Sequence, residues 1–176
     1  MKKLILLVSV ILSLVIFVGA FAEDCIPAAE VKGTIYKGKL VISTNATLPP
    51  LQYADENGNL MGMRVELGEE IAKRLCLEPE TVNVQFDAMI PALGERWDMI
   101  NTGLFFTEER SKLMYLIPYE LNAISISVAN EKYFGLTKTE ELAGLKVGVE
   151  IGGYEEKQIK AINDEQVAAG LNPMTI

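Results

Sequence analysis

The stretch KLVISTNATLPPLQYADENGNLMGMRVELGEEIAKRLCLEPETVNVQF, residues 39–86, contains the pattern that decides the fold. Residues 39–44 form a short apolar run rich in β-branched side chains, which is typical of a buried strand. Residues 63–76 change to helical spacing, with a leucine or isoleucine at every fourth position and charges on the opposite side. Residues 81–86 alternate as a second strand. A strand, a helix and a strand in this order predict an α/β fold with mainly parallel pairing.

The segment between the first strand and the helix is expected to begin as a loop and to continue as a hairpin. The Pro49-Pro50 pair excludes a central strand or a helix and predicts an extended loop. Asn57-Gly58 has apolar residues on both sides, which predicts a β-hairpin with a two-residue turn.

Strands and helices continue to alternate along the rest of the sequence. We expect Asp87 to cap a short helix that ends at Gly94, and residues 97–102 to form a strand. The pattern next predicts a helix capped by Thr107 and a strand at 122–131. A helix with a Thr137–Glu140 capping box should follow and end at Gly144. The last predicted elements are a strand at 145–153 and a helix that begins at Tyr154 and ends at Gly170.

Residues 1–22 have the layout of a secretory signal peptide. Two lysines precede a long apolar run, and Ala20-Phe21-Ala22 is a small-x-small cleavage site. An uncleaved membrane anchor is the alternative, because the apolar run borders on spanning length. Lipidation of Cys25 is a third option, which the Asp24 before it disfavours. We expect cleavage after Ala22 and a periplasmic or secreted protein.

Charge and composition exclude several classes of function. Cleavage removes two of the 16 basic residues and none of the 24 acidic ones, which leaves 14 against 24 and a formal net charge of −10. Nucleic acid requires clustered positive charge, so it is not an expected partner. The sequence has no histidine, the commonest general base and metal ligand, and we expect no metal or cofactor.

The only two cysteines are Cys25 and Cys76. In an oxidising compartment an even pair favours a disulfide, and closing this loop would stabilise the fold by about 4 kcal/mol on the chain-entropy model. The alternative is two unrelated thiols, with Cys76 buried at the end of its helix.

Three segments place the end of a strand next to the start of a helix: 45–52, 102–110 and 151–155. In open α/β sheets ligands bind beyond the carboxyl ends of strands, where helix N-termini attract anions. Gly152 and Gly153 allow close approach of the backbone, and the guanidinium of Arg110 matches a carboxylate with two hydrogen bonds. The alternatives are a plain turn at the glycines and a surface charge at Arg110 that pairs with a neighbouring glutamate.

Three quoted segments carry a resemblance to a known family: KLVISTNATLPPLQYADENGNLMGMRVELGEEIAKRL, FDAMIPALGERWDMINTGLFFTEERSKLMYLIPYE and TEELAGLKVGVEIGGYEE. In order and spacing they resemble the solute-binding proteins of family 3, the periplasmic amino-acid receptors of ABC importers. The resemblance covers nearly everything after residue 38. The lead cysteine and the Cys76-Leu77 pair are similar to one branch of the family, which supports the disulfide.

The resemblance implies a two-lobe, periplasmic-binding-protein-like (type II) α/β fold with parallel-rich sheets and a hinge near 119–122. Family members continue beyond residue 176, so we expect an incomplete second lobe, either in a fragment of a longer reading frame or in a naturally shortened protein. The expected division is a signal peptide at 1–22, a lead-in at 23–38, lobe one at 39–121 and a partial lobe two at 122–176.

The resemblance also implies the ligand-contacting positions. Arg110 would hold the α-carboxylate of the ligand, Thr102 and Gly103 would line the first lobe, and amides around Gly153 and Tyr154 would bind from the second. The complete expected set is Asn45, Leu48, Leu51, Thr102, Gly103, Phe105, Arg110, Gly153 and Tyr154.

Four of these positions depart from the family pattern. Leu48 and Leu51 stand where aromatic residues are frequent, and Asn45 stands where an acid is common. Phe105 replaces a small hydroxyl residue, and Phe106 follows in a slot that is often aliphatic. We expect Phe105 to face the cleft and Phe106 to pack inward. The alternative is that both rings are core residues.

The favoured function is a binding receptor that captures a small carboxylate-bearing solute, such as an amino acid, for the membrane permease of an ABC importer. The first alternative is an enzyme on the same scaffold, such as a periplasmic dehydratase of cyclic acids, for which we find no positioned acid or base. The second is the sensor domain of a larger receptor.

Overall fold

The computed structural model describes residues 25–129 and 135–176. The expected signal peptide, residues 1–22, lies outside the described residues. None of the described helices combines the length and the apolar character that a membrane crossing requires.

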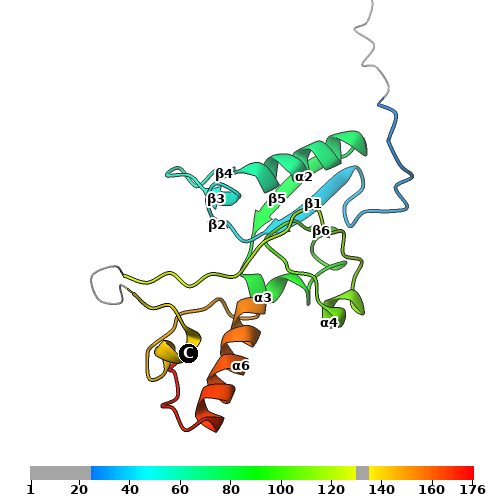
Figure 1. Cartoon of the computed structure of the whole chain (residues 1–176). Helices are drawn as coiled ribbons and strands as arrows, with labels where there is room; N and C mark the ends of the chain where they lie inside the picture. The colour runs from blue at the N-terminus through cyan, green and yellow to red at the C-terminus, as the bar shows by residue number, and fades with distance from the viewer. Residues whose placement is uncertain (1–24, 130–134) are drawn as a thin grey trace, which may run out of the picture.

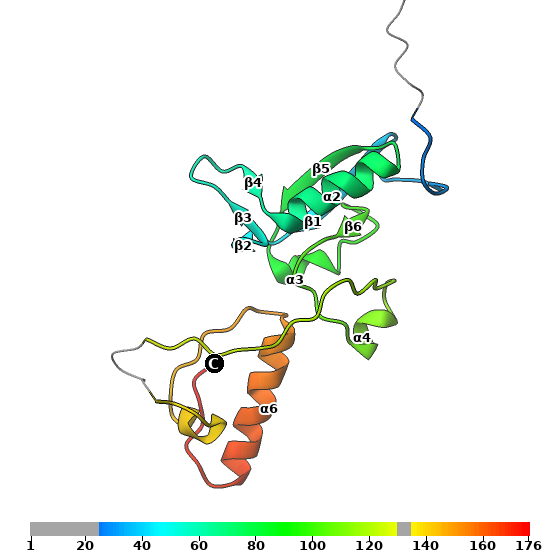
Figure 2. The same ribbon diagram turned by 45° about the horizontal axis from the view of Figure 1, so that its top comes forward.

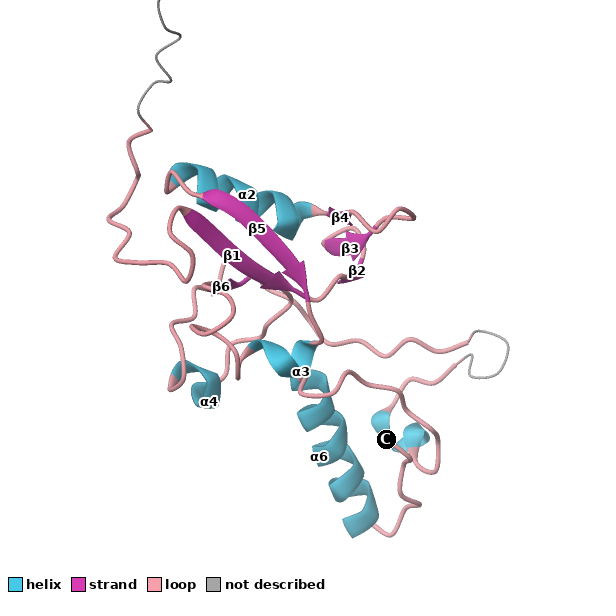
Figure 3. Cartoon of the chain, turned by 180° about the vertical axis from the view of Figure 1, so that it is seen from behind, coloured by secondary structure: helices cyan, strands magenta, loops and turns pink. Residues whose placement is uncertain are grey.

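The first group of elements, called the sheet group, is built on a parallel sheet with the strand order β5-β1-β6. Its strands are β1 (Lys39–Thr44), β5 (Glu78–Asn83) and β6 (Met99–Ile100). The helices α2 (Met63–Arg74) and α3 (Phe86–Met89) lie on opposite sides of this sheet (Figures 1 and 3). The predicted parallel α/β arrangement is confirmed.

The central strand β1 supplies both halves of the core because its side chains alternate between the faces. Ile42 packs with Ala72 on the α2 side, while Val41 packs with Met89 and Trp97 on the α3 side. Burying a side chain of the size of Ile42 or Met89 stabilises the fold by about 1.5–3 kcal/mol. The two-sided burial explains why this strand has no polar alternation in the sequence.

The hairpin that precedes α2 consists of β2 (Thr47–Leu48), β3 (Gln52–Ala54) and β4 (Leu60–Met61). The predicted two-residue turn is wrong. Asp55 pairs with Asn59 through the backbone, Gly58 adopts φ 84°, and the Asp55 carboxylate accepts the backbone N–H groups of Asn57 and Asn59. This makes a three-residue loop with glycine in the left-handed position, which the aspartate stabilises.

Two further boundaries differ from the sequence prediction. The second parallel strand begins at Glu78 instead of residue 81, because all six residues of β1 find partners on it. The following helix is capped by Gln85, not by Asp87, and ends at Met89, two residues before Pro91. Proline lacks the N–H that a longer helix would need at that position.

The disulfide between Cys25 and Cys76 is present, with 5.7 Å between the two Cα atoms. It connects the lead-in to the C-terminal end of α2, where Ala28 N–H also donates to the carbonyl of Arg74. The predicted pairing is confirmed.

The second group of elements, called the α6 group, consists of the 3₁₀ helix η1 (Thr139–Leu142) and α6 (Tyr154–Ala168). Leu142, Ile159 and Met174 form its own small hydrophobic cluster. In Figures 1 and 2 this group lies apart from the parallel sheet, and the start of α6 lies near α3.

Three predictions in this region are wrong. Within 122–129 no strand forms, and the alternating Ile124, Ile126 and Val128 are exposed, because no described strand lies alongside to pair with them. Residues 130 and 131 of that prediction lie outside the described residues. The run 145–153 contributes a single parallel bridge, from Lys146 to Thr175. The capping acid is Glu141, one residue later than expected, and its carboxylate accepts the N–H of Lys138.

Candidate functional site

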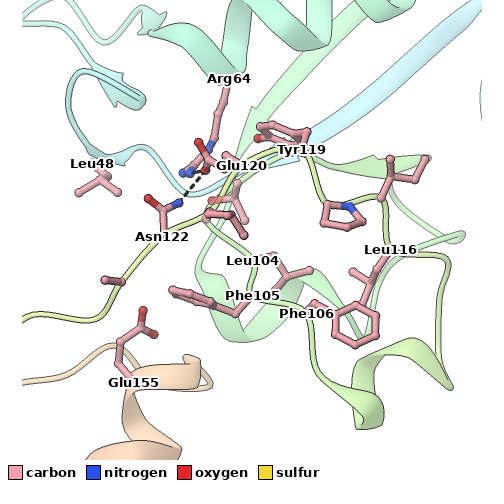
Figure 4. Close-up of a pocket in the computed structure, with 16 residues that line it drawn as sticks. Leu48, Arg64, Leu104, Phe105, Phe106, Leu116, Tyr119, Glu120, Asn122 and Glu155 are labelled. Atoms are coloured by element: carbon pink, nitrogen blue, oxygen red, sulfur yellow. Dashed lines mark hydrogen bonds and ion pairs between the residues drawn. The ribbon is translucent and has the colours of Figure 1, made fainter.

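A pocket of about 370 Å³ lies between the carboxyl end of the sheet and the start of α6 (Figure 4). Most of its wall belongs to the loop after β6 and to the segment 116–123, while Glu155 reaches it from α6. The lining residues are Leu48, Arg64, Thr102, Gly103, Leu104, Phe105, Phe106, Leu116, Ile117, Pro118, Tyr119, Glu120, Leu121, Asn122, Ala123 and Glu155.

The structure brings part of the predicted set into this pocket. The predicted residues that line it are Leu48, Thr102, Gly103 and Phe105. The predicted residues that do not line it are Asn45, Leu51, Arg110, Gly153 and Tyr154. Thr102, Gly103 and Phe105 come from the loop that follows β6, and Leu48 comes from β2, which follows β1. Both places lie at the carboxyl ends of parallel strands, as expected.

Arg110 lies on α4 (Glu108–Ser111), at the third helical position. Thr107 caps this helix as predicted, because its hydroxyl accepts the N–H of Arg110 at 3.1 Å. The buried guanidinium donates from Nη1 to the carbonyl of Phe105 at 2.8 Å and from Nη2 to the carbonyl of Gly152 at 3.1 Å. Burial lowers the pKa of Arg110, and the nearby Glu155 and Glu109 oppose this shift. Arg110 therefore connects the sheet group to the α6 group.

The two glycines before α6 do not present free amides. Gly152 N–H donates to the carboxylate of Glu156 at 2.8 Å, and Gly153 N–H donates to the carbonyl of Glu150 at 3.2 Å. Gly152 has φ 76°, and a Cβ there would lie 3.3 Å from Cβ of Asp87. Glycine at this position thus allows the α6 group to approach α3 closely.

Phe105 faces the pocket, and its ring centroid lies 5.2 Å from that of Tyr154. The expectation that Phe106 packs inward is wrong, because 57% of its surface is exposed. Leu104 packs against the core cluster instead. The ring of Phe106 is left at the pocket margin (Figure 4).

Asn45 and Leu51 have structural contacts. The Asn45 amide donates to the carbonyl of Val84 at 3.2 Å, which ties the ends of β1 and β5 together. The carbonyl of Leu51 accepts the N–H of Arg64 at 2.9 Å, at the start of α2. Thr102 lines the pocket, and its hydroxyl accepts from the side-chain amide of Gln52 at 3.3 Å.

Sequence reasoning missed Arg64, whose side chain is 1% exposed. Its Nη1 donates to Oε1 of Gln52 at 2.7 Å, and its Nη2 forms an ion pair with Glu120. The backbone carbonyl of Arg64 accepts from Asn101, whose side-chain oxygen accepts the hydroxyl of Tyr119 at 3.0 Å. The sequence held one signal for it. A cation in the first turn of a helix is unfavourable in the field of the helix dipole, which indicates that Arg64 has a specific anionic partner.

The described part of the chain contains no group of three or more histidine, cysteine, aspartate or glutamate residues that could hold a metal ion. The pocket instead combines an apolar wall, made by Leu48 and Phe105, with three charged side chains, Arg64, Glu120 and Glu155. Such a lining suits a small solute that has both polar and apolar parts.

The family model described as bacterial extracellular solute-binding proteins, family 3, matches residues 40–172. The chain belongs to this family. The match covers the sheet group, the pocket and α6, so the resemblance found in the quoted motifs extends through both groups of elements.

Individual relatives agree with this assignment. The chain is 31% identical to the arginine-binding extracellular protein ArtP of Bacillus subtilis over 73% of this chain and 50% of the relative. It is 29% identical to the L-cystine-binding protein TcyJ of Escherichia coli over 68% of this chain and 46% of the relative. The chain thus spans about half the length of the curated relatives it matches.

Solved structures show the same fold. An ancestral arginine-binding protein bound to arginine superimposes with a TM-score of 0.62 and 29% identity, over 79% of this chain and 60% of that one. An ancestral amino-acid-binding protein that is a precursor of cyclohexadienyl dehydratase gives a TM-score of 0.66 and 26% identity, over 78% and 69%. The fold of this family 3 protein is therefore the type II periplasmic-binding-protein α/β fold, over part of its length.

Proposed function

We propose that this family 3 protein captures a small carboxylate-bearing solute, such as an amino acid, and delivers it to the membrane permease of an ABC importer. The observation that carries the proposal is the pocket between the sheet group and the α6 group, at the carboxyl ends of parallel strands. The relatives named above are amino-acid-binding proteins, which supports the same ligand class.

In this proposal Arg110, which does not line the pocket while it contacts Gly152, binds the carboxylate of the solute once that contact is exchanged. The bond from Nη2 of Arg110 to the carbonyl of Gly152 is the contact that the carboxylate would replace. A neutral carbonyl is the weaker acceptor, because hydrogen bonds to an ionised partner are about twice as strong. The exchange would free Gly152 and the start of α6 to move relative to the sheet group.

We further propose that the sheet group belongs to lobe one, residues 39–121, and that residues 122–176 belong to lobe two. The segment 119–122 would act as the hinge, and closure would follow from contacts that the solute makes only in the closed state. Cleavage after Ala22 would release the protein outside the cytoplasm. The proposed role is non-catalytic, and the family is named for binding solutes rather than for a reaction.

A thermal-shift screen of the purified chain against amino acids and small carboxylic acids tests the proposal. A ligand that binds only the folded state raises the melting temperature with concentration by mass action. We expect at least one amino acid to do so, with the compound recovered unchanged after incubation. Stabilisation by none of them would contradict the proposal, and conversion of a cyclic acid would favour the dehydratase-like alternative.

A further inference from the structure

The charged residues of the pocket do not balance. One cation, Arg64, lines it together with two carboxylates, Glu120 and Glu155. Figure 4 shows Arg64 and Glu120 together on one side, with Glu155 approaching from α6 on the other. The net negative charge favours a solute group that carries a positive charge.

Glu120 is the better oriented of the two carboxylates. Its Oε1 accepts from Nη2 of Arg64 and from the side-chain amide of Asn122, the latter at 3.0 Å. The described residues offer no hydrogen-bond partner to its Oε2. The side chain is 29% exposed, so a solute in the pocket can reach it. Glu120 thus presents one fixed, unused acceptor to the pocket.

Arg64 is held too tightly to turn away from Glu120. Nη1 of Arg64 donates to Oε1 of Gln52. Gly103 packs closely against the same nitrogen, since a Cβ at Gly103 would lie only 3.1 Å from it. A buried guanidinium must also keep an anionic partner, because an uncompensated buried charge costs several kcal/mol. The pair therefore fixes the position of the Glu120 carboxylate.

We propose that Glu120 receives the ammonium group of the solute, and that Arg64 is the positioning residue that orients it. The inference rests on the proposed function and adds the residue that distinguishes an amino acid from a plain carboxylic acid. The ammonium would donate to Oε2 of Glu120, while the apolar part of the solute lies against Leu48 and Phe105. A charge-assisted bond of this kind discriminates strongly against an analogue that lacks the donor, because Oε2 then loses water without gaining a partner.

The test compares each amino acid with its des-amino analogue, on the wild type and on Glu120→Gln. The probe pairs are L-leucine with isocaproate, L-glutamine with glutaramate, and L-arginine with δ-guanidinovalerate. Dissociation constants come from calorimetry for the pair whose amino acid binds the wild type best. We expect Glu120→Gln to reduce the preference for the amino acid by about thirty-fold or more, with the des-amino acid binding nearly unchanged.

Glu155→Gln tests the competing assignment, because it neutralises the other carboxylate of the pocket. A preference lost there and kept in Glu120→Gln would assign the ammonium to Glu155. Arg64→Met should reduce the preference as Glu120→Gln does, whereas a merely structural role would weaken both probes equally. Should Glu120→Gln fail to fold, the double variant Arg64→Met/Glu120→Gln, which leaves no unpaired buried charge, replaces it.

The outcomes separate the two proposals. If neither the six probes nor any compound of the thermal-shift screen binds the wild type, the proposed function fails, and this inference fails with it. If amino acids bind but the preference survives Glu120→Gln, or is lost in Glu155→Gln instead, only the assignment of Glu120 is overturned.

Discussion

The guanidinium of Arg110, at the proposed carboxylate site, donates one hydrogen bond to the carbonyl of Phe105 and one to the carbonyl of Gly152. Lysine keeps the charge and loses the planar fork. We expect Arg110→Lys to weaken binding of the best amino acid by about 2–4 kcal/mol, which is thirty-fold or more in the dissociation constant. Calorimetry measures it. Arg74→Lys, at an exposed arginine paired with Glu70, is the control, and equal affinities for both variants would contradict the role.

Replacement of Gly152 by alanine is expected to destabilise the fold. Alanine there meets a left-handed φ of 76° and Cβ of Asp87 at 3.3 Å, whereas alanine at Gly170 meets a similar φ of 81° and open space. The backbone cost alone is about 1–2 kcal/mol. We expect both variants to lose stability in urea denaturation, and Gly152→Ala to lose more. If Gly152→Ala lost less stability than Gly170→Ala, the close approach to Asp87 would not contribute to the cost of the substitution.

Sequence reasoning identified residues that line the pocket where the end of a strand decides their position, and their contact with a ligand stays a prediction. Thr102 and Phe105 follow β6 directly, and the carboxyl end of a parallel strand is where a ligand site is expected. It failed for Arg64 and Glu120. Their pairing joins residues 56 positions apart, and no local pattern reports which charged side chain of an amphipathic helix turns inward.

At the scale of elements, the ion pair between Lys157 and Glu109 links α6 to α4. The hydrogen bond from Lys157 lowers the pKa of Glu109 from its usual 4.5 to about 2. Because the folded-state pKa is the lower one, the stabilisation is present above pH 4.5 and is lost as the pH falls towards 2. We expect Glu109→Gln to lower the urea midpoint at pH 7, and the difference from the wild type to shrink across that window.

Glu108→Gln is the control for the pH series, because Glu108 lies in the same first turn of α4 but its side chain forms no ion pair among the described residues. Its urea midpoint at pH 7 should lie close to that of the wild type, because no ion pair is lost. A Glu109→Gln difference that stays constant down to pH 2 would show that Lys157 does not stabilise the contact between the two helices.

Element prediction succeeded where local sequence and tertiary packing agree. The β1 run, the α2 stripe and the helix between Gly153 and Gly170 form close to the expected bounds. It failed at 122–129, because an alternating pattern indicates only that a segment can form a strand, and a neighbouring strand must supply its hydrogen-bond partners. The single bridge at Lys146 shows the same limit.

At the scale of the whole molecule, the segment 113–128 leaves a row of apolar side chains in solvent. Leu113 is 72% exposed, Tyr115 99%, Ile117 85% and Leu121 100%. Several large apolar side chains exposed along one segment favour association. We expect the purified chain to self-associate with rising concentration, as measured by light scattering after size exclusion, and the double variant Leu113→Ser/Tyr115→Ser, which leaves the pocket lining intact, to associate less.

Val167→Ser is the matched control, since this residue is a 47% exposed apolar side chain on α6, away from that row. It should leave self-association unchanged, because an isolated exposed apolar side chain is ordinary on a protein surface. A monomeric wild type at all concentrations would mean that the row of apolar side chains finds cover within one molecule. Association that both variants reduce equally would point to general surface hydrophobicity rather than to the segment that crosses from the sheet group to the α6 group.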